Sequence, residues 1–279
     1  MKVYIQTDIE GVAGVLSFED RVSKSQENLL HRHRMYRLLT GEVSAAVRGA
    51  KAAGADVIYV NDSHGSGYNI FFEELEPGCE IIHGRASRHA TWLPFLDKTF
   101  DALVCVGMHA MTCTPRANLP HSKWEVNGGQ VYLSECTMAF ALAGYHGVPS
   151  VFVSGDQAIV AEAREKVPDV RAAIVKEAMH PFAARSVLPG EAQRRIEAGV
   201  REGVAARRSI GPYKVPGPPY RLNILDSPDH ASEQRCLEED VTGDDFQEVF
   251  DRAIRCSPWS RKRGSQEVDG YRYPDNQAP

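Results

Sequence analysis

The sequence predicts an α/β fold: a mostly parallel sheet with flanking helices, carrying its functional site at the carboxyl-terminal ends of the strands. Short apolar runs, each too brief for a helix, recur along the first half of the chain and are typical of buried strands. The first two runs are separated by a long segment with apolar residues at three- and four-residue spacing, which predicts a crossover helix. Polar and glycine-rich residues follow several runs, as expected where strands end at a site.

The first predicted strand begins with the apolar run 3–5 and leads into two carboxylates, Asp8 and Glu10. If the strand continues to Glu10, side chains two residues apart point to the same face of the sheet. Gly11 and Gly14 are expected to turn the backbone sharply after it. Two anionic groups on one face repel each other unless a divalent metal, an arginine or a lysine lies between them. The alternative is an exposed acidic pair beside a turn.

The next elements complete a βαβ unit and extend the sheet. Apolar periodicity predicts one long helix over 24–53, with a break allowed near Thr40-Gly41, and Gly54 is placed to cap its end. The segment 111–127 contains two prolines and little periodicity, so it is expected to be a long loop, and loops of this length are often functional. A short helix of small residues is predicted over 138–143. The further strands are predicted at 57–60, 80–82, 102–106, 131–133 and 151–153.

The later part of the chain differs in character from the first, and we predict that the whole chain consists of three parts. Residues 1–160 form the α/β domain that carries the site, 161–256 a smaller C-terminal α/β layer or domain, and 257–279 a polar tail that is expected to be poorly ordered. From residue 157 onward the pattern predicts helices and strands in alternation, at 158–166, 171–175, 189–206, 221–225 and 246–256.

Composition excludes several classes of function. The 279 residues are 43% apolar and 25% charged, as in an ordinary globular protein, and the net charge of −5 argues against a nucleic-acid partner. No apolar stretch is long enough for a membrane helix, and the acidic residues near the start exclude a signal peptide, so no membrane partner is expected. The six cysteines show neither metal-finger spacing nor a disulfide framework. A cytoplasmic location with reduced thiols is expected.

Residues of types that bind metals come directly after several predicted strands, so we expect them to lie at one edge of the sheet. The set contains three carboxylates and two imidazoles: Asp8, Glu10, His64, His109 and Glu135. This mixture suits Zn²⁺, with Mn²⁺ or Co²⁺ as substitutes. Five ligands exceed the needs of one catalytic zinc, so a two-metal site bridged by Asp8 fits the count better. Taken singly, each histidine is more often a polar cap, and Glu135 is also favoured at a helix start.

Five short motifs, in this order and at these intervals, resemble the D-aminopeptidase family of zinc metallopeptidases, the type encoded with dipeptide-transport operons. The likeness covers about residues 1 to 200, and no single motif is specific. The motifs are Thr7-Asp8-Ile9-Glu10-Gly11, Asn61-Asp62-Ser63-His64-Gly65, Gly107-Met108-His109-Ala110, Pro120-His121-Ser122 and Ser154-Gly155-Asp156.

The resemblance implies a two-zinc aminopeptidase that hydrolyses the N-terminal residue of short peptides, often ones containing D-amino acids. It implies metal binding by the five residues collected above, a catalytic role for His121, and a ring-like homo-oligomer enclosing a channel. Two places depart from the family pattern, namely Ser134-Glu135-Cys136-Thr137-Met138 and Gly155-Asp156-Gln157. Neither removes an implied ligand, but Cys136 and Met138 reshape the expected substrate pocket, so the preference for D- over L-residues stays open.

Two other functions remain open at this point. The opening around Asp8 also resembles haloacid-dehalogenase-like phosphatases, which would make Asp8 a nucleophile in a Mg²⁺-dependent reaction. That interpretation lacks a second aspartate after Asp156 and leaves three histidines, His64, His109 and His121, without a role. The other is a non-catalytic, ring-forming scaffold that binds metal.

Overall fold

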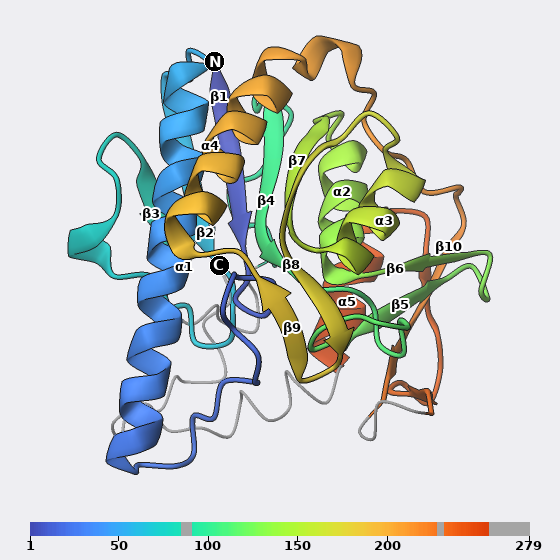
Figure 1. The fold of residues 1–279 in the computed structure, drawn as a ribbon. Coiled ribbons are helices and arrows are strands. Elements are labelled where there is room, and N and C mark those ends of the chain that lie inside the picture. Colours follow the sequence, from blue (N-terminus) through green and yellow to red (C-terminus); the bar gives the residue numbers. More distant parts are fainter. Residues whose placement is uncertain (85–90, 228–231, 257–279) are drawn as a thin grey trace, which may run out of the picture.

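The computed structural model describes residues 1–84, 91–227 and 232–256, which form two sheets with five helices around them (Figure 1). The tail expected at 257–279 lies outside the described residues.

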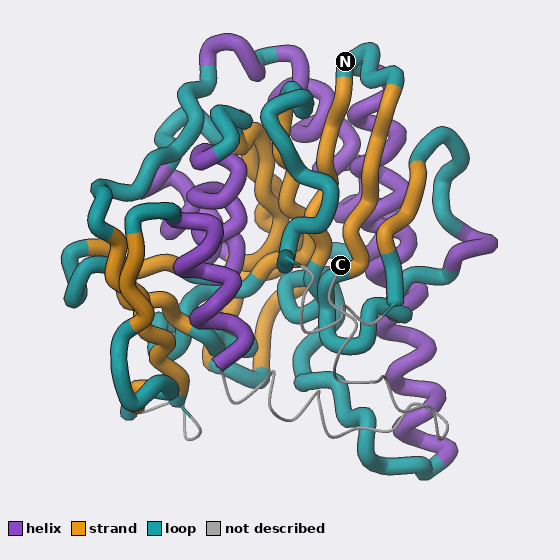
Figure 2. The backbone as a smooth tube through the Cα atoms, turned by 180° about the vertical axis from the view of Figure 1, so that it is seen from behind, coloured by secondary structure: helices purple, strands orange, loops and turns teal. Residues whose placement is uncertain are grey.

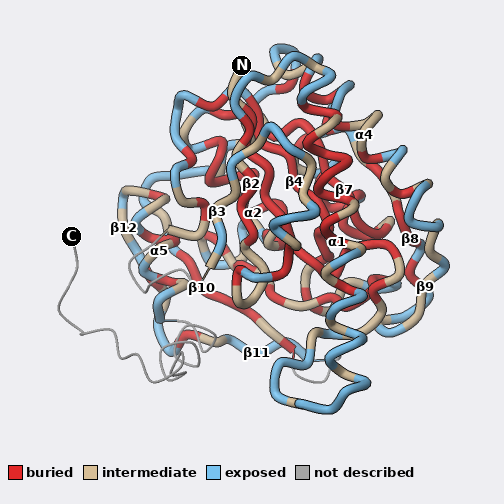
Figure 3. Tube along the Cα trace, turned by 90° about the vertical axis from the view of Figure 1, so that its left-hand side faces the viewer, coloured by how far each residue is buried: buried red, intermediate tan, exposed pale blue. Residues whose placement is uncertain are grey.

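A sheet of seven strands forms the centre of the molecule. Its order is β3-β2-β1-β4-β7-β8-β9, and all neighbouring strands are parallel except the last pair, which is antiparallel. Figure 3 shows its inner strands as buried, as expected for a sheet covered on both faces. The strands are β1 (Lys2–Thr7), β2 (Val57–Asp62), β3 (Glu80–Ile82), β4 (Ala102–Met108), β7 (Ser150–Asp156), β8 (Arg171–His180) and β9 (Ala183–Ser186).

Strand register brings the ends of three neighbouring strands to one level. β1 lies between β2 and β4, and Thr7 is aligned with Asp62 on one side and with Val106 on the other. The residues that follow these strands therefore meet at a single edge of the sheet. This register places Asp8 centrally, one residue beyond Thr7.

Helices cover the sheet. Helix α1 (Gln26–Ala52) begins after Ser25, whose side chain accepts the backbone N–H of Asn28, and it packs against α4 (Pro189–Ala205). In Figure 1 both helices lie on the near face of the sheet, and the first turns of α1 extend beyond the strand ends. The other helical segments near the sheet are α2 (Glu135–Tyr145), α3 (Gln157–Lys166) and the 3₁₀ turns Phe72–Glu74 and Arg207–Ser209.

A second, antiparallel sheet forms a smaller region beside the first, on the left in the view from behind (Figure 2). Its order is β11-β10-β5-β6, with β12 also paired to β10. Helix α5 (Phe246–Cys256) packs on it, and the ring of Phe250 lies 5.1 Å from that of Trp124. The strands are β5 (Lys123–Val126), β6 (Val131–Leu133), β10 (Tyr220–Asp226), β11 (Gln234–Arg235) and β12 (Val241–Gly243).

The structure confirms the predicted fold class and differs in the bounds of several elements. Helix α1 is unbroken at Gly41, because the positions around it are buried against the core and packing outweighs the low helix propensity of glycine. The segment expected to be a loop ends in β5, which is an alternating strand of four residues. β8 continues five residues beyond Val175, to His180, because β9 pairs with its last part.

The division of the chain at 160/161 stays a prediction. Pairing between strands crosses that point in both directions: β8 and β9 complete the main sheet, while β5 and β6 belong to the small one. We therefore describe the chain by its two sheets. Among the described residues, no helix combines the length and the apolar character needed to cross a bilayer.

The buried carboxyl of Glu42 on α1 makes the stability of the fold depend on pH. Its Oε1 accepts the backbone N–H of Ala13 at 2.9 Å, and burial, partly offset by that bond and by the charge of Lys176, raises its pKa from 4.5 to about 7. Because the folded state binds this proton more tightly, Glu42 removes stability as pH rises from about 4.5 to 7. Glu42→Gln is expected to abolish this component, of the order of 3 kcal/mol.

Urea unfolding of the metal-free chain at pH 5 and pH 8 measures this effect. The wild-type chain should lose more stability between the two values than Glu42→Gln does, since glutamine does not titrate. The exposed Glu27, near the start of the same helix, supplies the control variant Glu27→Gln, which should keep the wild-type pH dependence. Equal pH dependence in Glu42→Gln and wild type would contradict the prediction.

Candidate metal centre

The two carboxylates after β1 lie in a turn. β1 ends at Thr7, before both carboxylates, so the strand does not continue to Glu10; the backbone then turns with the N–H of Val12 donating to the carbonyl of Ile9. The Asp8 and Glu10 side chains still reach a common centre, and they are only 5% and 3% exposed. The turn, and not the alternation of side chains along a strand, therefore directs both carboxylates to one place.

Gly11 holds this turn against the end of β4. Its N–H donates to the carbonyl of Gly107 at 2.8 Å, and a Cβ on Gly11 would lie 2.0 Å from the carbonyl oxygen of Met108. Gly11→Ala is therefore expected to push the turn away from β4 and to destabilise the metal-free chain by about 1–3 kcal/mol. Urea unfolding measures this. Gly190→Ala, in open space at the start of α4, is the control and should be close to neutral; equal effects of the two changes would contradict the close approach.

Histidines approach the carboxylates from both neighbouring strands. His64, after β2, places Nδ1 2.9 Å from Asp8 Oδ1 and 3.3 Å from Glu10 Oε2. His109, after β4, places Nε2 3.3 Å from Asp8 Oδ2 and 3.8 Å from Glu135 Oε1, while its Nδ1 donates to the Ala110 carbonyl.

Glu135 is presented by the start of helix α2. Ser134 caps this helix: its hydroxyl accepts the N–H of Thr137, and the Thr137 hydroxyl accepts the N–H of Ser134. The capping box fixes the first turn of the helix, and with it the position from which Glu135 reaches His109.

All six residues singled out in the sequence are brought together. Three groups of ligand atoms each lie within 4.8 Å of one another, and two of the groups share Asp8. These two are Asp8–Glu10–His64 and Asp8–His109–Glu135, while the third is Glu10–His109–His121. Two adjacent groups with one common carboxylate are the arrangement expected of two cations bridged by that carboxylate.

Polar atoms without hydrogen bonds mark the centre. Among the described residues, several buried side-chain polar atoms have no hydrogen-bond partner, and three of them, Asp8 Oδ2, Glu10 Oε2 and His109 Nε2, lie in this cluster. Leaving such atoms unpaired is costly, and a cation bound between them removes the cost. The residues present therefore fit a divalent metal, and their mixture of carboxylates and imidazoles fits zinc.

The buried negative charges of the cluster would also be stabilised by a positive charge among them. Burial and the neighbouring charge of Glu10 raise the pKa of Asp8 to about 7. Burial opposes the charged form of His109, yet the carboxylates of Glu135 and Asp8 outweigh it and raise the pKa of His109 to about 10. The carboxylates thus draw protons onto the adjacent imidazole, a demand that a bound cation would meet instead.

His121 lies above His109 with the two rings stacked, 3.7 Å between centroids and 17° between planes. Its Nδ1 lies 2.9 Å from the carbonyl oxygen of Leu119, an acceptor, so Nδ1 carries the proton and Nε2 is left for the centre. Burial lowers the pKa of His121, and the positive charge of His109 lowers it further. The rings of Phe18 and His121 pack nearly perpendicular to each other, with 5.2 Å between their centroids.

Sequence reasoning missed the buried side chains that hold the site in place. Lys176 donates to the carbonyls of Glu10 and Val15 and to Asn118 Oδ1, which ties the metal-ligand turn to the loop before His121. A lysine within the apolar run of β8 was the available signal. Glu19, which contacts His64, gave no signal, because it lies in a segment without periodicity.

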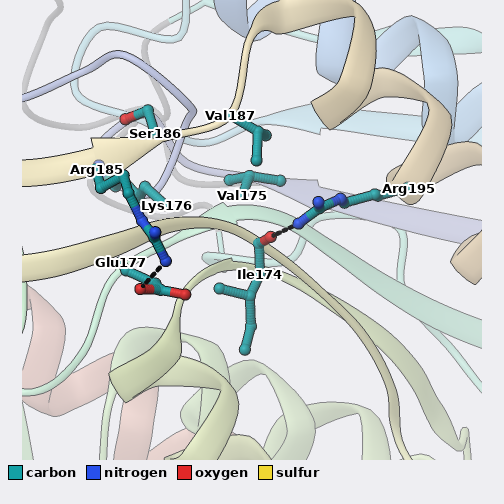
Figure 4. Close-up of a pocket in the computed structure, with 8 residues that line it drawn as sticks. All are labelled: Ile174, Val175, Lys176, Glu177, Arg185, Ser186, Val187 and Arg195. Atoms are coloured by element: carbon teal, nitrogen blue, oxygen red, sulfur yellow. Dashed lines mark hydrogen bonds and ion pairs between the residues drawn. The ribbon is translucent and has the colours of Figure 1, made fainter.

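A separate pocket of about 320 Å³ lies between β8, β9 and the first half of α4 (Figure 4). None of the predicted site residues lines it. Arg185 is paired with Glu177 at 2.6 Å, and Arg195 donates to the carbonyl of Ile174 at 3.0 Å, so both guanidinium groups have partners there. The pocket therefore offers no free positive charge, and we assign no ligand to it.

A parallel sheet that gathers carboxylates and imidazoles at its strand ends defines this chain as an α/β protein with a candidate metal site. The model of the M55 peptidase family, described as D-aminopeptidase, matches residues 1–242, and the chain belongs to this family. The predicted family and its enzyme class, peptide hydrolase, are confirmed. Membership selects the peptidase over the phosphatase and the non-catalytic scaffold.

Two relatives show how far the similarity reaches. The D-aminopeptidase of Bacillus subtilis (strain 168) is 28% identical over 225 residues, covering 78% of this chain and 79% of that protein. The solved structure of the Zn-dependent D-aminopeptidase DppA from Bacillus subtilis, described as a self-compartmentalizing protease, has a TM-score of 0.79 and 24% identity. It covers 96% of this chain and 100% of that one, which shows that the fold is shared almost throughout.

Proposed function

We propose that this chain is a zinc-dependent aminopeptidase with two metals, which removes the N-terminal residue from short peptides that contain D-amino acids. The observation that carries the proposal is the pair of ligand groups that share Asp8 around three unpaired buried polar atoms. The zinc dependence named for the DppA relative supports the choice of metal, with Mn²⁺ or Co²⁺ as substitutes.

Each ion would have its own ligands beside the shared one. Asp8, Glu10 and His64 would hold the first, and Asp8, His109 and Glu135 the second. Divalent ions bound there would supply Lewis-acid chemistry, since they acidify water and polarise a peptide carbonyl. Glu10 and Glu135 would in addition orient the two histidines through the contacts described above.

His121 is the proposed catalytic residue, through proton transfer or by stabilising the tetrahedral intermediate. The Leu119 carbonyl keeps the proton on Nδ1, so Nε2 can accept a proton from the attacking water or donate one to the leaving amine. Stacking on His109 keeps the ring beside the ligands.

We infer that the chain assembles into a ring-like homo-oligomer, in which an enclosed chamber would limit access to short peptides. The description of the DppA relative as self-compartmentalizing supports this inference. On this chain, the first turns of α1 carry Leu29 and Leu30, which are 51% and 64% exposed and would be covered in an assembly. Light scattering after size exclusion measures the mass; a monomer of 30.8 kDa would contradict the inference.

Metal content and turnover test the proposal directly. Plasma mass spectrometry of chain purified without added metal should give close to two zinc ions per chain. D-amino-acyl amides and short peptides should be hydrolysed, and paired D- and L-substrates would give the chirality preference. No transition metal, with activity only on phosphate esters in the presence of Mg²⁺, would overturn the proposal.

A further inference from the structure

The side of His64 that faces away from the centre meets a buried carboxylate. Nε2 of His64 lies 3.2 Å from Oε2 of Glu19, on the segment between β1 and α1. The Glu19 side chain is only 1% exposed. Because Nδ1 of the same ring faces Asp8 and Glu10, the imidazole is held between the metal-ligand carboxylates on one side and Glu19 on the other.

Glu19 is itself fixed by three donors. Arg32 Nε donates to its Oε1 at 2.9 Å, the Tyr36 hydroxyl donates to the same oxygen, and Arg21 Nε lies 2.8 Å from Oε2. Arg32 and Tyr36 come from α1, one turn apart, and the Arg32 guanidinium also bonds the Tyr36 hydroxyl. Two cations beside one buried carboxylate keep it negative, so it can only accept hydrogen bonds.

The segment that carries Glu19 packs closely on the loop that carries His64. A Cβ on Gly65 would lie 2.2 Å from a terminal nitrogen of Arg21, so the guanidinium lies directly on this glycine. Phe18, on the other side of Glu19, contacts the ring of His121. Neighbouring residues of one segment thus touch two histidines of the site.

We propose that Glu19 is a positioning residue for His64: it accepts a hydrogen bond from the Nε2–H group, which keeps the proton on Nε2 and leaves Nδ1 free to bind the ion shared with Asp8 and Glu10. A histidine can give a lone pair to a metal only from a nitrogen without a proton, so the partner of the other nitrogen selects the tautomer. A negative partner also makes the ring more basic and strengthens the bond to the metal. The proposal rests on the proposed metal-dependent function.

Glu19→Gln tests this role with little change in shape. The variant keeps an oxygen near Nε2 but loses the charge, so zinc affinity should fall about 10- to 100-fold at one of the two sites and stay unchanged at the other. Competition with a chromophoric chelator measures both affinities without any reference to activity. Tyr36→Phe, which removes one hydroxyl from Glu19 and does not touch His64, should weaken the same site by a smaller factor.

Asp20→Asn is the matched control. Asp20 is the next residue, and its carboxylate accepts only the N–H groups of Val22 and Ser23 among the bonds described. This variant should bind both ions as the wild type does. In a His64→Ala background, Glu19→Gln should leave the affinity of the remaining site unchanged, since Glu19 acts through His64.

The outcomes separate this proposal from the proposed function. If the wild-type chain binds two zinc ions and both Glu19→Gln and Tyr36→Phe bind them equally well, the positioning role is wrong and the peptidase proposal stands. If both sites weaken together, or if the effect persists without His64, Glu19 acts on the fold and not on this ring. If the wild-type chain binds no zinc, both proposals fail.

Discussion

Asp8→Ala is expected to lose both zinc ions, and with them all measurable peptidase activity. Asp8 belongs to both ligand groups, and its two oxygens face different histidines, Oδ1 towards His64 and Oδ2 towards His109. Each ion would be left with two protein ligands, fewer than the three that catalytic zinc sites keep. Plasma mass spectrometry and a chelator titration measure the stoichiometry and affinity of the variant.

The chain should fold without Asp8. Removing this carboxylate relieves its repulsion with Glu10 in the metal-free state, so the metal-free variant should be about as stable as the metal-free wild type. Glu42→Gln is the control for loss of a buried carboxyl outside the centre and should keep both ions. One full equivalent of tightly bound zinc in Asp8→Ala would show that Asp8 does not bridge.

His121→Ala is expected to keep both zinc ions and to lose most turnover. General acid–base catalysis by a positioned histidine contributes about 10²- to 10⁴-fold, and we expect kcat to fall by a factor in this range. The ligand groups around Asp8 do not include His121, so metal affinity should change little. Steady-state kinetics on D-amino-acyl amides, together with metal analysis of the same samples, measure both quantities.

A different result would assign His121 another role. Loss of one zinc ion would make it a ligand, which the third group, Glu10–His109–His121, allows. Unchanged kcat with both ions bound would remove it from the mechanism. His146→Ala, at the end of α2, is the control for removing a histidine away from the centre and should have wild-type kinetics.

The fold class and the grouping of the site residues could both be predicted from the sequence, and for the same reason. Parallel strands end at a common edge, so residues that follow separate apolar runs must meet there, whatever the exact strand bounds are. This is why Asp8 and Glu10 meet His64 even though β1 ends at Thr7, before both carboxylates.

Other features could not be predicted, because they depend on partners distant in the sequence. β5 has only four residues, and it lies between β6, its neighbour along the chain, and β10, which pairs with it from about a hundred positions later. Glu19 carries no local pattern, since its burial depends on Arg32 of α1, and the lysine in the apolar run of β8 does not reveal that Lys176 bonds the carbonyl of Glu10. Side chains that support a site are therefore harder to find than those that form it.

The position of β1 between β2 and β4 has a consequence for how the unfolded chain would interact with zinc. Asp8 is synthesised early, but its nearest partner along the sequence outside its own turn, His64, lies 56 residues away, and Glu135 comes much later. An unfolded chain cannot close such loops around an ion without a large loss of entropy, so zinc would have little affinity for it. Zinc would then act as a selective stabiliser of the finished sheet, raising its melting temperature with free zinc concentration while leaving the earliest steps of folding untouched.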